Sequence, residues 1–237
     1  MRSVRFQQLV DFVQSRAGID PALPENAHRA ALVADYAQDA IGEAWTHFPW
    51  PEIWLTEERT PTGSPATSIP FVSAETNPIG SVVKVHSANP ATHASRELSF
   101  IESDTSVTIT DADYAAGTPV WVEFTLPRPV FSLTAYNPEA TYAPGDVVFY
   151  NGDCWKCIAQ STDNAPDHAD FWLKQTVPAF LADYIKTKGL ADLLLEIPGQ
   201  ENKADYLSRR AEGILLREID EAWLRKGRVH HYTARFQ

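Results

Sequence analysis

Two cysteines have the spacing that most directly suggests chemistry in this 237-residue chain. Cys154 and Cys157 form the motif CWKC, a spacing used by structural zinc sites and by thioredoxin-like redox centres. A structural zinc site needs four ligands, and the chain has no second cysteine pair. A redox pair begins a helix, whereas this one lies in a strand-like run whose positions i and i+3 point to opposite faces. The pattern therefore predicts two reduced thiols.

Histidines and carboxylates do not form a catalytic pattern either. The seven histidines are scattered, and the adjacent pair His230 and His231 would point to opposite faces of a strand. Glu57 and Glu58 diverge for the same reason, so they do not make a converging carboxylate pair. The acidic stretch DTSVTITDAD lacks the glycine and the terminal glutamate of an EF-hand, and no common nucleophile or phosphate-binding motif occurs. We therefore expect no catalytic residue, no metal site, no cofactor and no enzymatic activity.

The charge balance further limits which classes of function the chain can have. A formal net charge of -11 disfavours a general nucleic-acid binder, which needs a positive surface. An acidic surface would keep the protein soluble, or it would line a channel through which DNA passes without adhering. No apolar run approaches the roughly 20 residues of a membrane span, and the first residues lack the apolar segment of a secretory signal. We expect a protein of the cytosol.

Helical periodicity marks both ends of the chain. Ser3 is expected to cap a first helix that Gly18 and Pro21 end, and a second, alanine-rich helix is expected from Pro24 to His47. Thr176 and Pro178 are expected to begin a third helix, with an interruption possible at Gly189. A last helix is expected over 200–226, with Gly227 as its stop and RVHHYTARF as a strand or extended arm. Its apolar face would comprise Ala204, Leu207, Ala211, Ile214, Leu215, Ile219, Ala222 and Trp223.

The middle of the chain is β-like. GSVVKVH, SVTIT and PVWVEFTL are strand candidates between turn-rich segments, and TPTGSPATSIP is expected to be an exposed loop. Neither helical pair can bury its apolar stripe alone, so we expect the N-terminal and C-terminal helices to pack on each other. The fold class is thus α+β: a helical bundle, a central small antiparallel β-domain, and an inserted three-stranded β-module. The expected domains are 1–128, 129–175 and 176–237.

Residues 135–175 hold the most distinctive local pattern. Gly145-Asp146 and Asn151-Gly152 are turn dipeptides, and Asn-Gly between two β-runs is a strong hairpin signal. With aromatics at regular places, the stretch resembles the family 5/12 carbohydrate-binding modules attached to chitinases. The aromatic pair that stacks on sugar in that family is replaced here by Ala159 and Gln160. If the module contacts a glycan, Tyr142 and Trp155 are the candidate residues; otherwise its aromatics are structural and staple a small sheet.

The flanking parts resemble a different family. The order of helix, loop, helix and W…WPE, then the β-region from IGSVVKVHSANP to PVWVEFTLPRPVF, then the helix ADYLSRRAEGILLREIDEAW, looks like head-to-tail adaptor proteins of tailed bacteriophages. The resemblance implies a structural protein of the virion neck, assembled in the host cytoplasm. It implies a dodecameric ring joining the portal protein to stopper or tail proteins, with DNA passing through the lumen.

In that interpretation the C-terminal arm would contact the portal, with His231, Tyr232 and Phe236 as candidate residues. The alternative function is a carbohydrate-binding accessory protein whose helices present the module. A ring seen by electron microscopy would favour the first function, and retention on chitin or peptidoglycan would favour the second.

Overall fold

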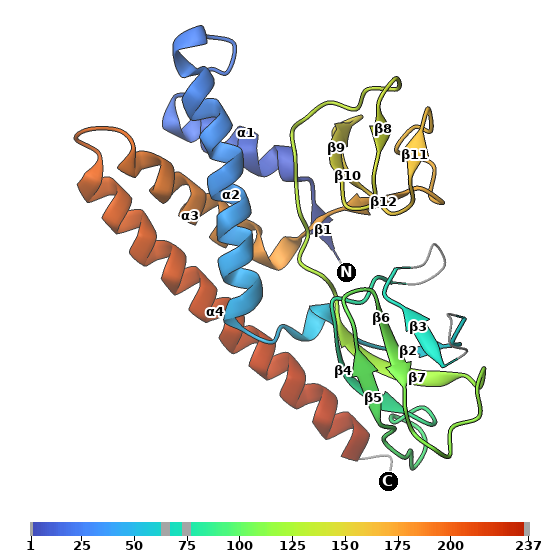
Figure 1. Ribbon diagram of the computed structural model, residues 1–237. Coiled ribbons are helices and arrows are strands. Elements are labelled where there is room, and N and C mark those ends of the chain that lie inside the picture. Colours follow the sequence, from blue (N-terminus) through green and yellow to red (C-terminus); the bar gives the residue numbers. More distant parts are fainter. Residues whose placement is uncertain (1, 63–66, 73–76, 235–237) are drawn as a thin grey trace. The chain divides into compact units, whose positions relative to one another are not determined.

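A computed structural model describes residues 2–62, 67–72 and 77–234. The chain divides into two compact units, one comprising residues 1–48 and 129–224 and the other residues 49–128 and 225–237. The expected α+β class is confirmed: helices from both chain ends pack together, and several small antiparallel sheets lie between them in the sequence (Figure 1). Each unit is described separately below.

The N-terminal helices of the first unit bury narrow apolar stripes. α1 (Phe6–Ala17) buries Phe6, Leu9, Val10 and Val13, and it ends as predicted at Gly18, whose φ of 70° suits the left-handed C-cap. The 3₁₀ turn η1 (Pro24–Asn26) leads into α2 (Ala27–His47), so the predicted second helix is confirmed. Ser3 does not cap α1: it lies with Val4 in the short strand β1 (Ser3–Val4), and Arg5 occupies the cap position.

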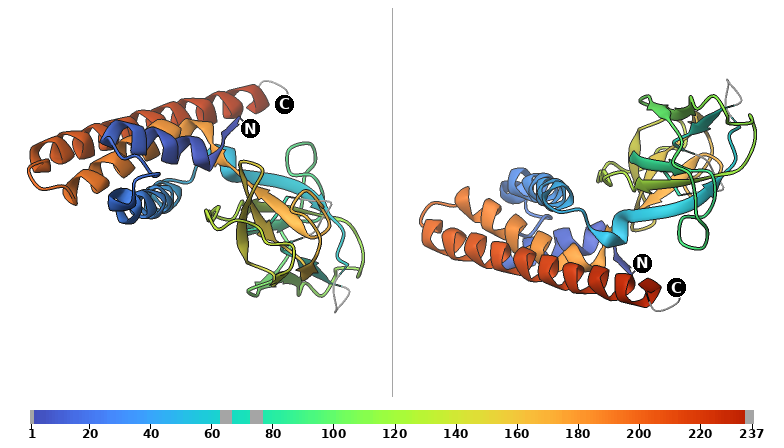
Figure 2. Two further views of the ribbon diagram at one scale, coloured as in Figure 1. Left: turned by 90° about the horizontal axis from the view of Figure 1, so that it is seen from above. Right: turned by 90° about the horizontal axis from the view of Figure 1, so that it is seen from below.

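The C-terminal helices complete the bundle. The turn η3 (Ala179–Leu181) precedes α3 (Ala182–Leu195), and α4 (Glu201–Ala234) follows a turn at Gly199. The helices of the two chain ends lie side by side in Figure 1 and in both views of Figure 2. On α4 the buried row is Ala204, Leu207, Ala211, Leu215 and Ala222. Trp223 was predicted to share this row, but it is 55% exposed and meets the Phe48 ring edge-on.

Three helix boundaries differ from the expectation. Pro178 lies in the strand β13 (Val177–Pro178), which pairs with β1, so α3 begins only at Ala182. Gly189 does not interrupt α3: it lies within the helix, buried next to the Ala37 backbone of α2. Gly227 does not stop α4, which continues to Ala234 and replaces the expected strand or arm there. Continued backbone hydrogen bonding outweighs the cost of about 1 kcal/mol for one helical glycine.

The inserted module contains the predicted three-stranded sheet. Strands β9 (Val147–Tyr150), β10 (Asp153–Cys157) and β12 (Trp172–Gln175) pair in the order β12-β10-β9, and β8 (Thr141–Tyr142) pairs with β11 (Ser161–Thr162). The hairpin predicted from Asn-Gly is confirmed, since Asn151 and Gly152 have φ of 50° and 81° between the paired residues Tyr150 and Asp153. Two positive φ values are the signature of a type I′ turn.

Three contacts hold the module to the bundle within the first unit. β1 and β13 form an antiparallel ribbon that joins the start of α1 to the start of η3. The Phe6 and Phe131 rings stack with centroids 4.4 Å apart. The Arg5 guanidinium lies 3.4 Å from the Asp153 carboxylate. The module is therefore attached both to its own chain neighbours and to the N-terminal segment.

The second unit is a small antiparallel β-domain, as predicted. Its elements are η2 (Pro51–Ile53), β2 (Trp54–Arg59), β3 (Ser68–Pro70), β4 (Ser81–His86), β5 (Phe100–Glu102), β6 (Ser106–Ile109) and β7 (Val120–Thr125). The two sheets have the orders β2-β7-β4 and β3-β6-β5, and one core of eleven buried hydrophobic residues belongs to both. Hydrogen bonds from Ser87 to Arg96 and from Leu98 to Val85 link the end of β4 to the segment before β5.

The three strand candidates of this region correspond to β4, β6 and β7, whereas β3 and β5 were not predicted. β3 occupies the end of the segment that was expected to be an exposed loop. Ser68 and Ile69 are buried there because β3 pairs with β6 and Ile69 enters the core.

Candidate functional site

Tyr142, one of the two candidate glycan contacts, belongs to the core of the module. Its ring stacks on Tyr136 at 5.5 Å and meets Trp172 edge-on at 5.2 Å. Its hydroxyl accepts a hydrogen bond from the backbone N–H of Asn137 at 2.8 Å and donates one to the Asn137 carbonyl at 3.2 Å. The ring and the hydroxyl of this half-buried residue are thus engaged within the module, which is the structural alternative considered from the sequence.

Trp155, the other candidate, is partly buried and packs against the cluster of Val148, Cys157 and Trp172. Its indole N–H donates to the Tyr150 carbonyl at 3.3 Å. The ammonium of Lys174 lies 5.7 Å from the ring centroid and is held by the Asp153 carboxylate at 2.6 Å. A sugar stacking on Trp155 would have to share the ring with this cation. The structure does not bring Tyr142 and Trp155 together as an exposed stacking pair.

The cysteine pair has the predicted free state. Both thiols are free and buried, and the strand alternation of β10 places them on opposite faces. Cys154 donates to the Ser132 carbonyl at 3.2 Å, and Cys157 donates to the Ala159 carbonyl at 2.9 Å. Burial raises the pKa of Cys154 to about 11, and burial also raises the pKa of Cys157. Both thiols therefore stay protonated at neutral pH, which disfavours metal binding and nucleophilic attack.

The remaining titratable candidates also make structural contacts. Glu57 pairs with buried Arg59, while its neighbour Glu58 is exposed. His86 lies between Ser95 and Glu123, and Ser, His and Glu are also the residue types of a hydrolase catalytic triad. Its distances of 3.4 Å to Ser95 Oγ and 3.6 Å to the Glu123 carboxylate exceed those of good hydrogen bonds. Among the described residues, no group of three or more His, Cys, Asp and Glu could hold a metal ion.

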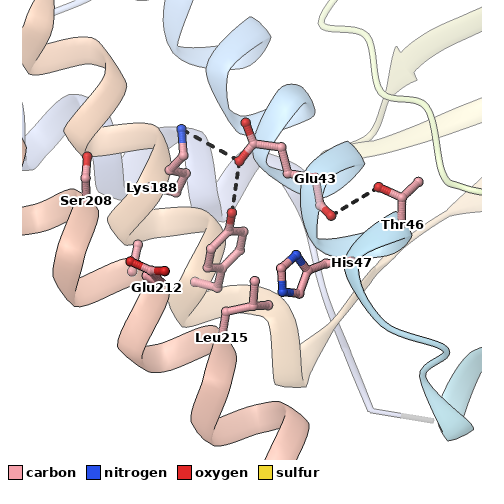
Figure 3. A pocket seen from close by; sticks show the side chains of 9 residues that line it. Glu43, Thr46, His47, Lys188, Ser208, Glu212 and Leu215 are labelled. Atoms are coloured by element: carbon pink, nitrogen blue, oxygen red, sulfur yellow. Dashed lines mark hydrogen bonds and ion pairs between the residues drawn. The ribbon is translucent and has the colours of Figure 1, made fainter.

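A groove opens where α2, α3 and α4 converge (Figure 3). Its volume is about 690 Å³. α2 contributes Glu43, Thr46 and His47, and α4 contributes Glu212 and Leu215 among its residues. The floor includes Tyr184 from α3, which is only 4% exposed. The groove lies wholly within the helical bundle and combines carboxylates with an apolar base.

Hydrogen bonds and ion pairs fix the polar side of this groove. The Tyr184 hydroxyl donates to the Glu43 carboxylate at 3.0 Å, and Lys188 lies 3.7 Å from the same oxygen. Lys188 also binds Asp192 at 2.6 Å. Burial first, and then the charge of Glu43 and the hydrogen bond to it, raise the pKa of Tyr184 well above its ordinary range. A phenol held protonated in this way ties α2 to α3 and cannot act as a base.

α4 presents a second row of side chains away from the bundle. Tyr206, Leu216 and Leu224 are 63%, 52% and 65% exposed. Gly213 lies in the same row, and a Cβ added there would meet nothing within 4 Å. The row was not predicted, because helical periodicity alone placed the apolar residues of α4 on a single buried face. The spacing from Tyr206 through Gly213 to Leu216 was the available signal.

The C-terminal candidates lie mostly beyond what the structure describes. His231 and Tyr232 belong to the helical part of α4, but their side chains are not described, and Phe236 lies outside the described residues. The groove and the outward row of α4 were both missed, since each depends on how separate helices pack.

Comparisons with known proteins give no assignment. No known protein-family model matches the chain, and no curated protein is similar to it in sequence. Along the part of the chain that the structure describes, no helix is both long enough and apolar enough to cross a membrane. Function therefore has to be argued from the fold and its surfaces.

Proposed function

We propose that this protein is a structural, non-enzymatic component of a tailed-phage neck: a head-to-tail adaptor that joins the portal to stopper or tail proteins. The observation that carries the proposal is the outward row of α4. α4 already buries Ala204, Ala211 and Leu215 in the bundle, yet Leu216 and Leu224 remain more than half exposed. Exposed apolar side chains in a row on a folded helix are typical of an assembly surface.

The layout of the chain supports the same proposal. Helices from both chain ends close on each other, and the chain between them forms β-modules, which is the order that the adaptor resemblance implies. The module of residues 129–175 is an addition to this layout. The β1–β13 pairing and the Phe6–Phe131 stack attach this module to the bundle, so we expect it to keep a fixed position there.

The net charge of -11 fits a protein that stands close to DNA without holding it. Phosphates repel an acidic surface, so a channel lined by it lets the duplex pass. In this proposal the ring is formed by copies of the chain, and DNA is a passing molecule rather than a ligand.

The alternative of a carbohydrate-binding accessory protein receives less support. Tyr142 is committed to Tyr136, Trp172 and Asn137, and Trp155 is covered in part by Lys174. Retention of the protein on chitin or peptidoglycan, lost in Trp155→Ala with the fold intact, would reverse this preference.

The proposal is tested by mixing the protein with the portal protein encoded in the same phage genome and imaging the mixture by negative-stain electron microscopy. We expect a ring of this protein stacked on one end of the portal. The charge change Leu224→Glu should prevent the ring, because Leu224 is 65% exposed in the outward row, whereas Glu212→Gln, which alters the groove, should not. Failure of the wild-type protein to join the portal at micromolar concentrations would overturn the proposal.

A further inference from the structure

The outward face of α4 carries a set of residues in a regular 4-3 repeat, which we call the 4-3 row. Its members are spaced alternately by three and four residues, and they face away from the buried row of the same helix. This spacing is the one that lets two helices pack along a common seam. The row consists of Tyr206, Arg209, Gly213, Leu216, Asp220 and Trp223.

The row is complementary to itself when its direction is reversed. If a second α4 is laid antiparallel, with the midpoint between Ile214 and Leu215 in register, Arg209 faces Asp220 of the second copy. In the same register Gly213 faces Leu216, and Tyr206 faces Trp223. The first pair joins a cation to an anion, the second joins a small residue to a large one, and the third joins two aromatic residues. Because a two-fold axis repeats every pair, one register satisfies all of them twice.

The side chains needed for this register are accessible. The Arg209 side chain is 78% exposed and is held by Asp205 of its own helix at 2.9 Å. Leu216 is 52% exposed, and the open space above Gly213 would receive it. Trp223 keeps its edge contact with Phe48 and still exposes 55% of its surface to a second helix.

Charge also selects the orientation. A parallel pair in register would place Arg209 against Arg209 and Asp220 against Asp220, which are repulsive contacts. The antiparallel pair replaces both by attractive ones. Charges at such positions set partner choice and direction in paired helices more than they add affinity.

We propose that two copies of this protein associate through an antiparallel pairing of α4 centred between Ile214 and Leu215. The interface is one helix wide, so it lies below the roughly 1,600 Å² of a standard interface, and we expect a dissociation constant in the micromolar range. This association does not depend on the proposed place in a phage neck. A two-fold contact closes on itself and gives a dimer, whereas a ring needs a different contact.

Sedimentation velocity over a concentration series tests the pairing. The wild-type protein should shift from monomer to dimer as its concentration rises. Arg209→Asp and Asp220→Arg should each weaken dimerisation at least tenfold, because each leaves two like-charged contacts. The double variant Arg209→Asp/Asp220→Arg should restore it, as should a mixture of the two single variants. Arg210→Asp is the matched control: it changes the same charge one position outside the row and should leave dimerisation unchanged.

Cysteine cross-linking tests the direction of the pair. In the antiparallel register Gly213→Cys and Leu216→Cys should form a disulfide when the two variants are mixed, and neither should do so alone. The native thiols are buried and do not compete. Circular dichroism establishes that every variant folds. A wild-type protein that stays monomeric at about 100 µM, or Leu216→Cys that cross-links to itself, would overturn the proposal.

Discussion

The fold changes the acid–base chemistry of single residues most strongly at two buried groups, the Tyr184 hydroxyl and the Cys154 thiol. Tyr184 is 4% exposed, and its hydroxyl donates a hydrogen bond to the Glu43 carboxylate across the α2–α3 contact. Cys154 is 2% exposed beside the carbonyl of Ser132. In both cases burial is the largest cause of a raised pKa. The folded protein therefore binds these protons more tightly than the unfolded chain, which has measurable consequences.

Tyr184 makes the stability fall at alkaline pH. Its pKa is raised above the ordinary value of 10.0, so the stabilising protonated form is fully present below about pH 10. As the pH rises past that value, the unfolded chain releases the proton first, and stability is lost progressively toward the higher folded pKa. We predict that Tyr184→Phe flattens this alkaline loss in urea titrations run between pH 9 and 11.

At neutral pH the same substitution should act in the other direction. It removes one hydrogen bond to a partly exposed carboxylate, so we expect a loss of about 1 kcal/mol at pH 7. Tyr206→Phe, at an exposed position of α4, is the control and should change neither slope nor stability. An alkaline profile of Tyr184→Phe that parallels the wild type would contradict the assignment.

The thiols should be inert until the protein unfolds. With the pKa of Cys154 raised to about 11, its thiolate fraction at pH 8 is on the order of a hundredfold below that of an ordinary cysteine. We predict that Ellman's reagent modifies native protein at least about a hundredfold more slowly than protein in denaturant. Cys154→Ser and Cys157→Ser should each leave one slowly reacting thiol. Rapid modification of one thiol in native protein would show that this thiol is not buried as described.

At the level of single residues, the sequence could predict the features that depend on local backbone geometry. Cys154 and Cys157 diverge because they are three apart on β10, and Asn151-Gly152 forms the turn because both residues accept positive φ. The environment of Tyr142 was not predictable in this way. Its contacts with Tyr136 and Trp172 join three separate segments of the module, and only the folded chain brings them together.

Among the elements, α3 packs on α2 at Gly189, which lies beside the backbone of Ala37. The Cβ of an alanine at position 189 would lie 3.7 Å from the Ala37 backbone nitrogen, an ordinary van der Waals distance. We predict that Gly189→Ala stabilises the protein by about 0.5–1 kcal/mol, because alanine costs less backbone entropy in a helix. Thermal unfolding measures the change.

Gly80, in the β-domain, gives the opposite prediction. A Cβ there would lie 2.6 Å from the Pro127 nitrogen, which is backbone and cannot move aside. Gly80→Ala should therefore destabilise the second unit by about 1–3 kcal/mol. Hydrogen exchange should show faster exchange in β4 and β7 and unchanged exchange in α3. If Gly189→Ala destabilises or Gly80→Ala is neutral, the local packing at that glycine is not as described.

The boundaries of the helices and strands show why local sequence patterns predict only part of the fold. The apolar stripes of α1, α2 and α4 follow from spacing alone, and the strands β4, β6 and β7 follow from alternation. Pro178 was assigned to a helix because its φ suits a first turn, but Ser3, far away in the sequence, pairs with it as a strand. The groove and the outward row of α4 arise from three-helix packing, which no single window of sequence contains.

On the scale of the whole molecule, charge is unevenly distributed along the chain. Residues 225–237 hold four of the 20 Lys and Arg residues and no Asp or Glu, so residues 1–224 hold 16 cationic against all 31 acidic side chains. In the proposed adaptor function, the surface that faces DNA would have to repel phosphate over most of its area. Any attraction to DNA should therefore be confined to the last residues of the sequence.

This distribution limits how the protein can interact with DNA. Each phosphate neutralised by a cation contributes about -0.9 to the slope of log K against log salt, so four cations permit a slope no steeper than about -3.6. We predict that fluorescence anisotropy with a duplex of random sequence gives no binding at about 150 mM salt and a slope within that limit at low salt. Substituting Arg225, Lys226 and Arg228 by Gln should remove the residual binding. A steeper slope, or binding that survives these substitutions, would require a basic surface within residues 1–224, and DNA would then be a ligand rather than a passing molecule.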